Sequence, residues 1–257
     1  MSDPILYKIS GAVGSMTINR PEARNALTFE MYDRIAEICA APSPDGRVKV
    51  LVISGAGDRA FAAGTDISQF RDFRKREDAL AYEERIEKAL RAIETSPVAT
   101  IAAISGACTG GGASIAIACD LRVATQDSVF GFPVARTLGN CLSISNCARL
   151  VSMVGAGRVM DMVLTARLLD AGTAEAAGLI SEVVPDHPAL IARVDELSET
   201  VAQHAPLTIR ATKEALRRLR EGRRDDEDLI TMCYMSEDFR EGLEAFLAKR
   251  KPSWRGR

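Results

Sequence analysis

Two glycine-containing turns hold the residues best placed to do chemistry. One is TGGGAS, residues 109–114, which joins an aliphatic run to an apolar helical run. The other is AFAAGTDISQF, residues 60–70, which also leads from a strand into a helix. Backbone N–H groups at a helix start have no intrahelical acceptor, so such turns can hold an anion or an oxyanion. The alternative is that the glycines only allow a strand and a helix to pack closely.

Two such turns after neighbouring buried strands could direct two N–H groups at one point. Paired donors of this kind stabilise the oxyanion or enolate of a thioester, and each contributes roughly 3 kcal/mol to the transition state. A nucleotide site is disfavoured, because GACTGGG matches neither the Walker pattern nor GxGxxG. Asp66 in the second turn has a simpler reading as the first polar residue of a helix.

Cysteine and histidine usage argues against a metal centre. The six cysteines include no CxxC pair, and the two histidines are His187 and His204. Cys108 and Cys119 lie among small apolar residues and are expected to be reduced, buried thiols. No metal and no separate cofactor is predicted.

The bulk composition indicates an ordinary globular protein. The chain has 257 residues, of which 47% are hydrophobic and 26% charged, with a formal net charge of −2. This balance gives no general attraction to nucleic acid or to an anionic membrane. No apolar run reaches the roughly 18 residues of a membrane span, and the first residues lack a signal-like pattern. We therefore expect a cytoplasmic protein.

The elements that must position the two turns alternate between strand and helix. The runs 6–10 and 12–19 predict a hairpin, Thr28 is expected to cap a helix, and aliphatic runs at 48–53 and 98–104 predict buried strands. A charged periodic stretch, 78–95, predicts a long amphipathic helix between those strands. Further short strands are expected in LRVAT, SVFGFP and LISEVV, and helices near 142, near 155 and at 173–177, 188–204, 207–221 and 226–249.

No linker or repeat divides the chain. We expect an α/β core over residues 1–200 and a helical region over residues 201–257 that is not an independent domain. The charged stretch RRLREGRRDDED is expected to be a solvated helix end and turn.

Six segments in order resemble the crotonase superfamily, which contains the enoyl-CoA hydratases and isomerases. They are NRPEARNAL, AFAAGTDI, IAAISGACTGGGASIAIACDLRVA, FGFP, VMDMVLTARLLDAGTAEAAGLISEVVP and EGLEAFLAKRKPSW. Together they cover nearly the whole chain, although each alone is weakly specific. The resemblance implies a spiral of ββα units with a C-terminal helical region, a homotrimer or a hexamer made of two trimers, and an acyl-CoA thioester as ligand.

The resemblance also assigns site residues. It implies that the thioester oxygen lies between the N–H groups of Thr65, where the family usually has alanine, and Gly111. The residues then expected along the CoA and the bound substrate are Arg24, Ala26, Ala63, Gly64, Asp66, Ile67, Gly110 and Pro133. Arg24 keeps an alternative reading as a plain surface cation.

The departures from the family pattern concern its acid–base groups. Hydratases of the family have a glutamate three residues after the oxyanion-hole glycine and another directly after the proline of FGxP. Here these positions hold Ser114 and Val134, neither of which can deprotonate a water molecule or protonate a carbon unaided. Ser114 also lacks a neighbouring histidine in the sequence, so a serine-hydrolase reading is disfavoured.

The segment after Val134 departs as well. It reads ARTLGNCLSISNCARL and brings Arg136, Thr137, Asn140 and Cys141 as candidates for new groups in the pocket. Arg136 could bind a second substrate carboxylate, or it could face solvent or a subunit interface.

Three functions follow as alternatives. The first is an acyl-CoA lyase or isomerase that relies on the oxyanion hole, for example a decarboxylase, because decarboxylation yields an enolate without removal of a proton. The second is a non-catalytic acyl-CoA binding protein, and the third is a weak enoyl-CoA hydratase.

Overall fold

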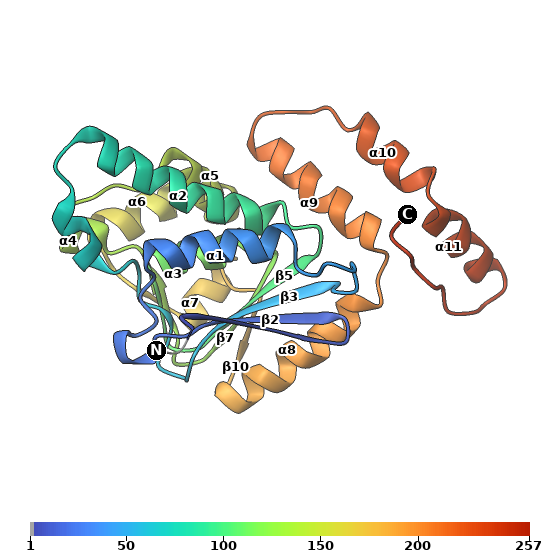
Figure 1. Cartoon of the computed structure of the whole chain (residues 1–257), viewed down its shortest axis with the longest axis horizontal. Coiled ribbons are helices and arrows are strands. Elements are labelled where there is room, and N and C mark those ends of the chain that lie inside the picture. Colours follow the sequence, from blue (N-terminus) through green and yellow to red (C-terminus); the bar gives the residue numbers. More distant parts are fainter. Residues whose placement is uncertain (1–2) are drawn as a thin grey trace.

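The structure, a computed structural model, describes residues 3–257 and begins with an antiparallel hairpin. Strands β1 (Ile5–Ser10) and β2 (Val13–Ile18) pair from Ile5 with Ile18 to Ser10 with Val13. The predicted hairpin is confirmed. It forms one edge of the larger of two sheets (Figure 1).

The larger sheet has the order β1-β2-β3-β5-β7-β10 and is parallel from β2 onward. Its further strands are β3 (Val50–Gly55), β5 (Ala99–Ile104), β7 (Leu121–Thr125) and β10 (Glu182–Val184). All six residues of β5 are buried, because this central strand is covered on both faces. The strands predicted at 48–53 and 98–104 are therefore confirmed.

A second sheet has the order β4-β6-β8-β9 and is built from very short strands. These are β4 (Ala60–Ala62), β6 (Ala107–Thr109), β8 (Val129–Gly131) and β9 (Leu169–Asp170). Strand β6 was not predicted, because three residues before a glycine turn give no periodic signal. Each of β3, β5 and β7 is followed by a strand of this sheet and then by helix, so the expected repetition of ββα units is confirmed.

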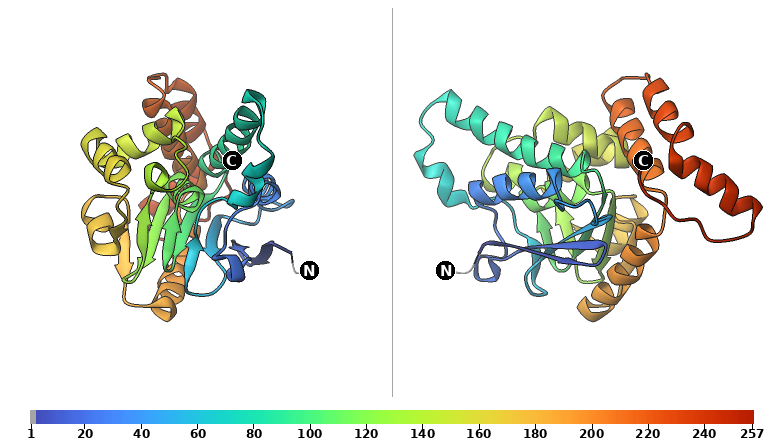
Figure 2. Two further views of the ribbon diagram at one scale, coloured as in Figure 1. Left: turned by 90° about the vertical axis from the view of Figure 1, so that its left-hand side faces the viewer. Right: turned by 45° about the vertical axis from the view of Figure 1, so that its right-hand side comes forward.

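Two helices lie side by side over one face of the larger sheet, and a third lies on the other (Figures 1 and 2). The pair is α1 (Phe29–Ala40) and α2 (Arg76–Glu94), and the third is α8 (His187–Ala202). Thr28 caps α1 as predicted, since its side chain accepts a hydrogen bond from the N–H of Met31.

The remaining helices of the core follow the strands of the second sheet. Helix α3 (Gly111–Ala118) starts directly after the turn that follows β6, and it is buried at seven of its eight residues. The others are η1 (Pro21–Ala23), η2 (Ile67–Asp72), α4 (Val134–Thr137), α5 (Ile144–Val154), α6 (Ala156–Thr165) and α7 (Ala171–Ala176).

The C-terminal helices are α9 (Pro206–Arg220), α10 (Glu227–Tyr234) and α11 (Glu237–Leu247). Helix α9 lies against the core, where Lys213 donates to Val98 O at 2.8 Å, whereas α10 and α11 project away from the sheets (Figure 2). The prediction of one helix over 226–249 was wrong, because Ser236 ends the preceding segment and caps α11 by accepting from the N–H of Phe239 at 2.9 Å. Among residues 3–257, no helix is both long and apolar enough to span a bilayer.

Candidate functional site

The two glycine turns of the sequence meet at the ends of β4 and β6. These strands pair in parallel, so the segments that follow them leave the sheet at the same edge. Gly64 (φ +104°) and Gly110 (φ +52°) adopt backbone conformations that favour glycine. A Cβ atom on Gly110 would lie 3.5 Å from the Cα of Gly64, and one on Gly112 would collide with the backbone of Ala62. Glycine therefore allows both the turns and their contact.

Two backbone N–H groups at this junction are free to donate. Within residues 3–257, the N–H groups of Thr65 and Gly111 have no acceptor, and both residues are partly exposed. Their neighbours are engaged: Asp66 donates to Leu27 O at 2.8 Å, and Gly110 donates to Gly131 O at 3.0 Å. Gly111 also opens helix α3, whose N-terminal dipole favours negative charge. Each turn thus offers one free N–H group, and their joint contact with a thioester oxygen stays a prediction.

A cluster of hydroxyl groups supports the first donor. Thr65 Oγ1 is 2.8 Å from the hydroxyl of Tyr32 on α1 and 2.9 Å from that of Tyr82 on α2. Burial raises the pKa of Tyr82 to about 12, and it raises the pKa of the fully buried Tyr32 further still. Both phenols are therefore neutral hydrogen-bonding groups at physiological pH. We refer to Tyr32, Thr65 and Tyr82 as the hydroxyl triad.

The triad is bordered by aromatic rings. The ring centroid of Tyr82 lies 4.8 Å from that of Phe70, 5.4 Å from that of Phe29 and 6.0 Å from that of Phe73. All four rings are partly exposed, so they present an apolar wall beside Thr65.

The segment expected to line CoA, residues 24–27, lies alongside the turn of residues 60–70. Ala63 N donates to Arg24 O at 3.0 Å, and Leu27 N donates to Gly64 O at 2.9 Å. Arg20 fixes the same junction, since its guanidinium donates to Ala26 O and to Asp66 at 2.7 and 3.0 Å.

Some side chains near this junction are held by hydrogen bonds, and others are exposed. Asp66 caps η2 as predicted, and hydrogen bonds from Ser68 first and Arg20 second lower its pKa. The side chains of Arg24 and Ile67 are exposed. The structure therefore brings residues 24–27 and 63–67 together, whereas their contacts with CoA stay a prediction.

The two positions where the resemblance places the glutamates of a hydratase hold Ser114 and Val134, which are neither acids nor bases. Ser114 lies within α3, is 4% exposed, and donates from its hydroxyl to Gly110 O at 3.2 Å. Val134 follows Pro133 and opens α4 in a half-buried position. His187 bonds Ser105 at 2.8 Å rather than Ser114, so the geometry offers Ser114 no histidine base.

The loop after Val134 is exposed. Arg136, Asn140 and Cys141 are all exposed, and in the part of the chain that the structure describes the guanidinium of Arg136 makes no hydrogen bond or ion pair. Thr137 donates to Pro133 O at 3.0 Å. No contact directs Arg136 toward Thr65 and Gly111, and its role stays a prediction.

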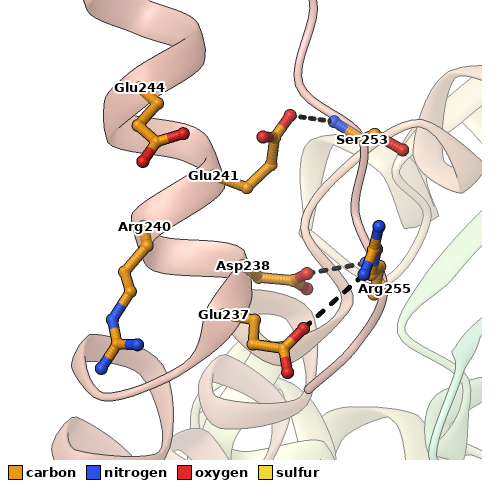
Figure 3. Close-up of a pocket in the computed structure, with 7 residues that line it drawn as sticks. All are labelled: Glu237, Asp238, Arg240, Glu241, Glu244, Ser253 and Arg255. Atoms are coloured by element: carbon orange, nitrogen blue, oxygen red, sulfur yellow. Dashed lines mark hydrogen bonds and ion pairs between the residues drawn. The ribbon is translucent and has the colours of Figure 1, made fainter.

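A polar pocket at the other end of the molecule has a structural explanation (Figure 3). Asp238 on α11 accepts from the N–H groups of Arg255 and Gly256 at 2.6 and 2.9 Å. Glu241 accepts from Ser253 N at 2.8 Å and pairs with Arg250. These carboxylates hold the C-terminal tail against α11, so the pocket does not compete with the paired amides as the candidate site.

Fold and site together define an α/β protein of the crotonase type with two unpartnered backbone N–H groups at the ends of β4 and β6. The profile of the enoyl-CoA hydratase/isomerase family matches residues 8–257. The chain belongs to the enoyl-CoA hydratase/isomerase family, as the resemblance of its motifs implied.

Individual relatives agree with this membership. The 2,3-dehydroadipyl-CoA hydratase of Escherichia coli strain K12 is 33% identical over 247 residues, which cover 94% of each chain. The crotonyl-CoA hydratase of Syntrophomonas wolfei is 32% identical over 92% of each chain. The crystal structure of an enoyl-CoA hydratase/carnithine racemase from Magnetospirillum magneticum superposes with a TM-score of 0.92 at 34% identity, covering 100% of this chain and 97% of the other.

Proposed function

We propose that this protein binds an acyl-CoA thioester and stabilises its enolate or oxyanion, in a reaction other than two-glutamate hydration. The observation that carries the proposal is the pair of unpartnered N–H groups of Thr65 and Gly111, side by side at the ends of β4 and β6. A thioester oxygen placed between them would receive two hydrogen bonds, and these strengthen as negative charge develops.

Ser114 and Val134 bear on the type of reaction. Hydration needs one group to activate water and one to protonate the α-carbon, and neither of these side chains does so. Decarboxylation or another lyase reaction suits the site better, because the enolate then forms as a C–C bond breaks and no carboxylate at 114 or 134 repels the leaving carboxylate. A non-catalytic acyl-CoA binding role and weak hydration are the alternatives.

The first experiment separates binding from catalysis. A mass-spectrometric screen of CoA thioesters, including malonyl-type substrates, scores bound ligands and new products together. Calorimetry of a thioester and the matching free acid adds the binding test, in which we expect the thioester to bind much more tightly. Equal affinities would refute a site built around CoA and the thioester.

The second experiment tests the missing glutamates. We expect wild-type hydration of crotonyl-CoA to be at least roughly three orders of magnitude below that of a two-glutamate hydratase, since one positioned acid or base contributes ~10²–10⁴-fold. The double variant Ser114→Glu, Val134→Glu should raise this rate above the wild-type background. A wild-type rate comparable with that of ordinary hydratases would contradict the proposal.

A further inference from the structure

One carboxylate beside the hydroxyl triad has no partner. Glu83 follows Tyr82 on α2 and is half-buried, and its carboxylate makes no hydrogen bond or ion pair anywhere in residues 3–257. A carboxylate removed in part from water ordinarily has a partner, because its desolvation is costly. An unpaired, partly buried carboxylate next to a candidate active site therefore calls for a functional explanation.

Three other acidic groups around the site are already engaged. Asp66 is held by Ser68 and Arg20, and Asp33 pairs with Arg85 at 3.3 Å. Glu87 binds Arg149 through both carboxylate oxygens at 2.8 Å. Each of these contacts holds the carboxylate in a fixed structural role and favours its charged form. Glu83 is free of such contacts.

The position of Glu83 on its helix directs it inward. Residues three and four apart on a helix share a face, so Glu83 lies on the side of α2 that carries the buried residues Ile86 and Leu90. Glu87, on the same face one turn later, reaches Arg149 on α5. Glu83 thus stands at the N-terminal end of the buried face of α2, at the level where the adjacent Tyr82 meets Thr65.

Electrostatic effects agree with this placement. The charge of Glu83 contributes to the raised pKa values of both Tyr82 and Tyr32. Tyr32 sits on a different helix, and its hydroxyl lies against Gly111 as well as Thr65. Glu83 therefore acts electrostatically on the two phenols that contact Thr65. Burial first and the charge of Glu87 second raise the pKa of Glu83, which brings it closer to the range useful for acid–base catalysis.

We propose that Glu83 is the acid–base residue of this site and exchanges a proton with the α-carbon of the bound thioester. As a base, its carboxylate takes a proton from the α-carbon, and the C–H electron pair becomes the enolate whose oxygen accepts from Thr65 N and Gly111 N. As an acid, it returns a proton to the α-carbon of an enolate, including one left by decarboxylation, and regains its own proton from water. This inference rests on the proposed function, since it requires the thioester to bind at these amides.

The test uses the full-length protein and butyryl-CoA in D2O, with deuterium at the α-carbon measured by mass spectrometry. We expect wild-type protein to accelerate the exchange over a protein-free control. Glu83→Gln should lower the enzymatic exchange rate by roughly 10²–10⁴-fold. Calorimetry with butyryl-CoA should give a Kd within about threefold of wild type, because Gln keeps the size of the side chain and the CoA contacts lie elsewhere.

Two further variants separate a catalytic role from a structural one. Glu84→Gln, at the exposed neighbouring residue of the same helix, should exchange like wild type. Glu83→Asp keeps the carboxylate at a shorter reach and should retain part of the rate that Gln loses. Undiminished exchange in Glu83→Gln, or a wild type that binds butyryl-CoA without exchange, would overturn the role of Glu83. A wild type that binds no CoA thioester would instead overturn the proposed function, and this inference with it.

Discussion

The contact between Gly111 and Tyr32 allows a quantitative test of how the proposed oxyanion hole is built. A Cβ atom at Gly111 would lie closer than 3.0 Å to the hydroxyl of Tyr32, a separation that real Cβ atoms essentially never show. Gly111 itself has no positive φ, so alanine can adopt its backbone conformation, and the strain of Gly111→Ala comes from this contact. Because Tyr32 is fully buried, its ring cannot swing into solvent. We expect Gly111→Ala to destabilise the fold by about 1–3 kcal/mol, the usual cost of overpacking a core.

Removal of the hydroxyl group should relieve the strain. Tyr32→Phe alone loses the 2.8 Å hydrogen bond to Thr65 and should cost about 1 kcal/mol. In the double variant, the nearest atoms to the new Cβ are Thr65 Oγ1 at 3.0 Å and the ring Cζ at 3.4 Å, so most of the clash is gone. The destabilisation of the double variant should then be about 1–2 kcal/mol smaller than the sum of the destabilisations of the two single variants.

The assay is urea-induced unfolding of the four proteins at one subunit concentration, since oligomerisation would otherwise shift the midpoints. Gly112→Ala is the matched control. Its Cβ would meet the backbone of Ala62 rather than Tyr32, so its cost should add to that of Tyr32→Phe without coupling. If the losses in unfolding free energy of Gly111→Ala and Tyr32→Phe add within about 0.5 kcal/mol, the contact described between Gly111 and Tyr32 is refuted.

Two further predictions concern acid stability and assembly. Hydrogen bonds from Arg217 lower the pKa of Glu214 to about 2, below its value of 4.5 in the unfolded chain. The charged carboxylate therefore stabilises the fold above about pH 4.5, and this stabilisation is lost as the pH falls toward 2. Glu214→Gln should therefore reduce stability by up to about 1 kcal/mol at about pH 5.5 and by less at about pH 3.5 in urea unfolding, and equal effects at both would contradict this. Phe246 on α11 is 82% exposed, and we expect it to lie at a subunit contact of a trimer-based oligomer. Light scattering should show a multiple of 27.7 kDa for wild type and a smaller mass for Phe246→Glu, whereas a wild-type monomer would exclude the assembly.

Local signals made much of the fold predictable. The hairpin at the start of the chain, the cap at Thr28 and the buried strand β5 depend on neighbouring residues, and each is confirmed. The errors came where local preference is weak. Strand β6 has three residues and exists because β4 and β8 pair with it, and the end of α10 depends on a single capping serine within a continuous helical pattern.

Part of the candidate site was likewise predictable from local sequence, and part was not. The free N–H groups of Thr65 and Gly111 were predictable, because a glycine turn before a helix exposes amides whatever the rest of the chain does. The hydroxyl triad was not, since Tyr82 reads in the sequence as one more apolar position of an amphipathic helix. Its hydroxyl becomes significant only when α1 and α2 pack side by side and bring it to Thr65, across 17 residues of chain. The position of Glu83 was not predictable for the same reason. A glutamate on a charged helix is expected to be solvated, and only the folded chain shows that this one is half-buried with no partner for its carboxylate. Ser114 and Val134 at the positions where the family pattern has glutamates can be read from the sequence, whereas the proposed role of Glu83 on α2 depends on contacts that exist only in the folded chain.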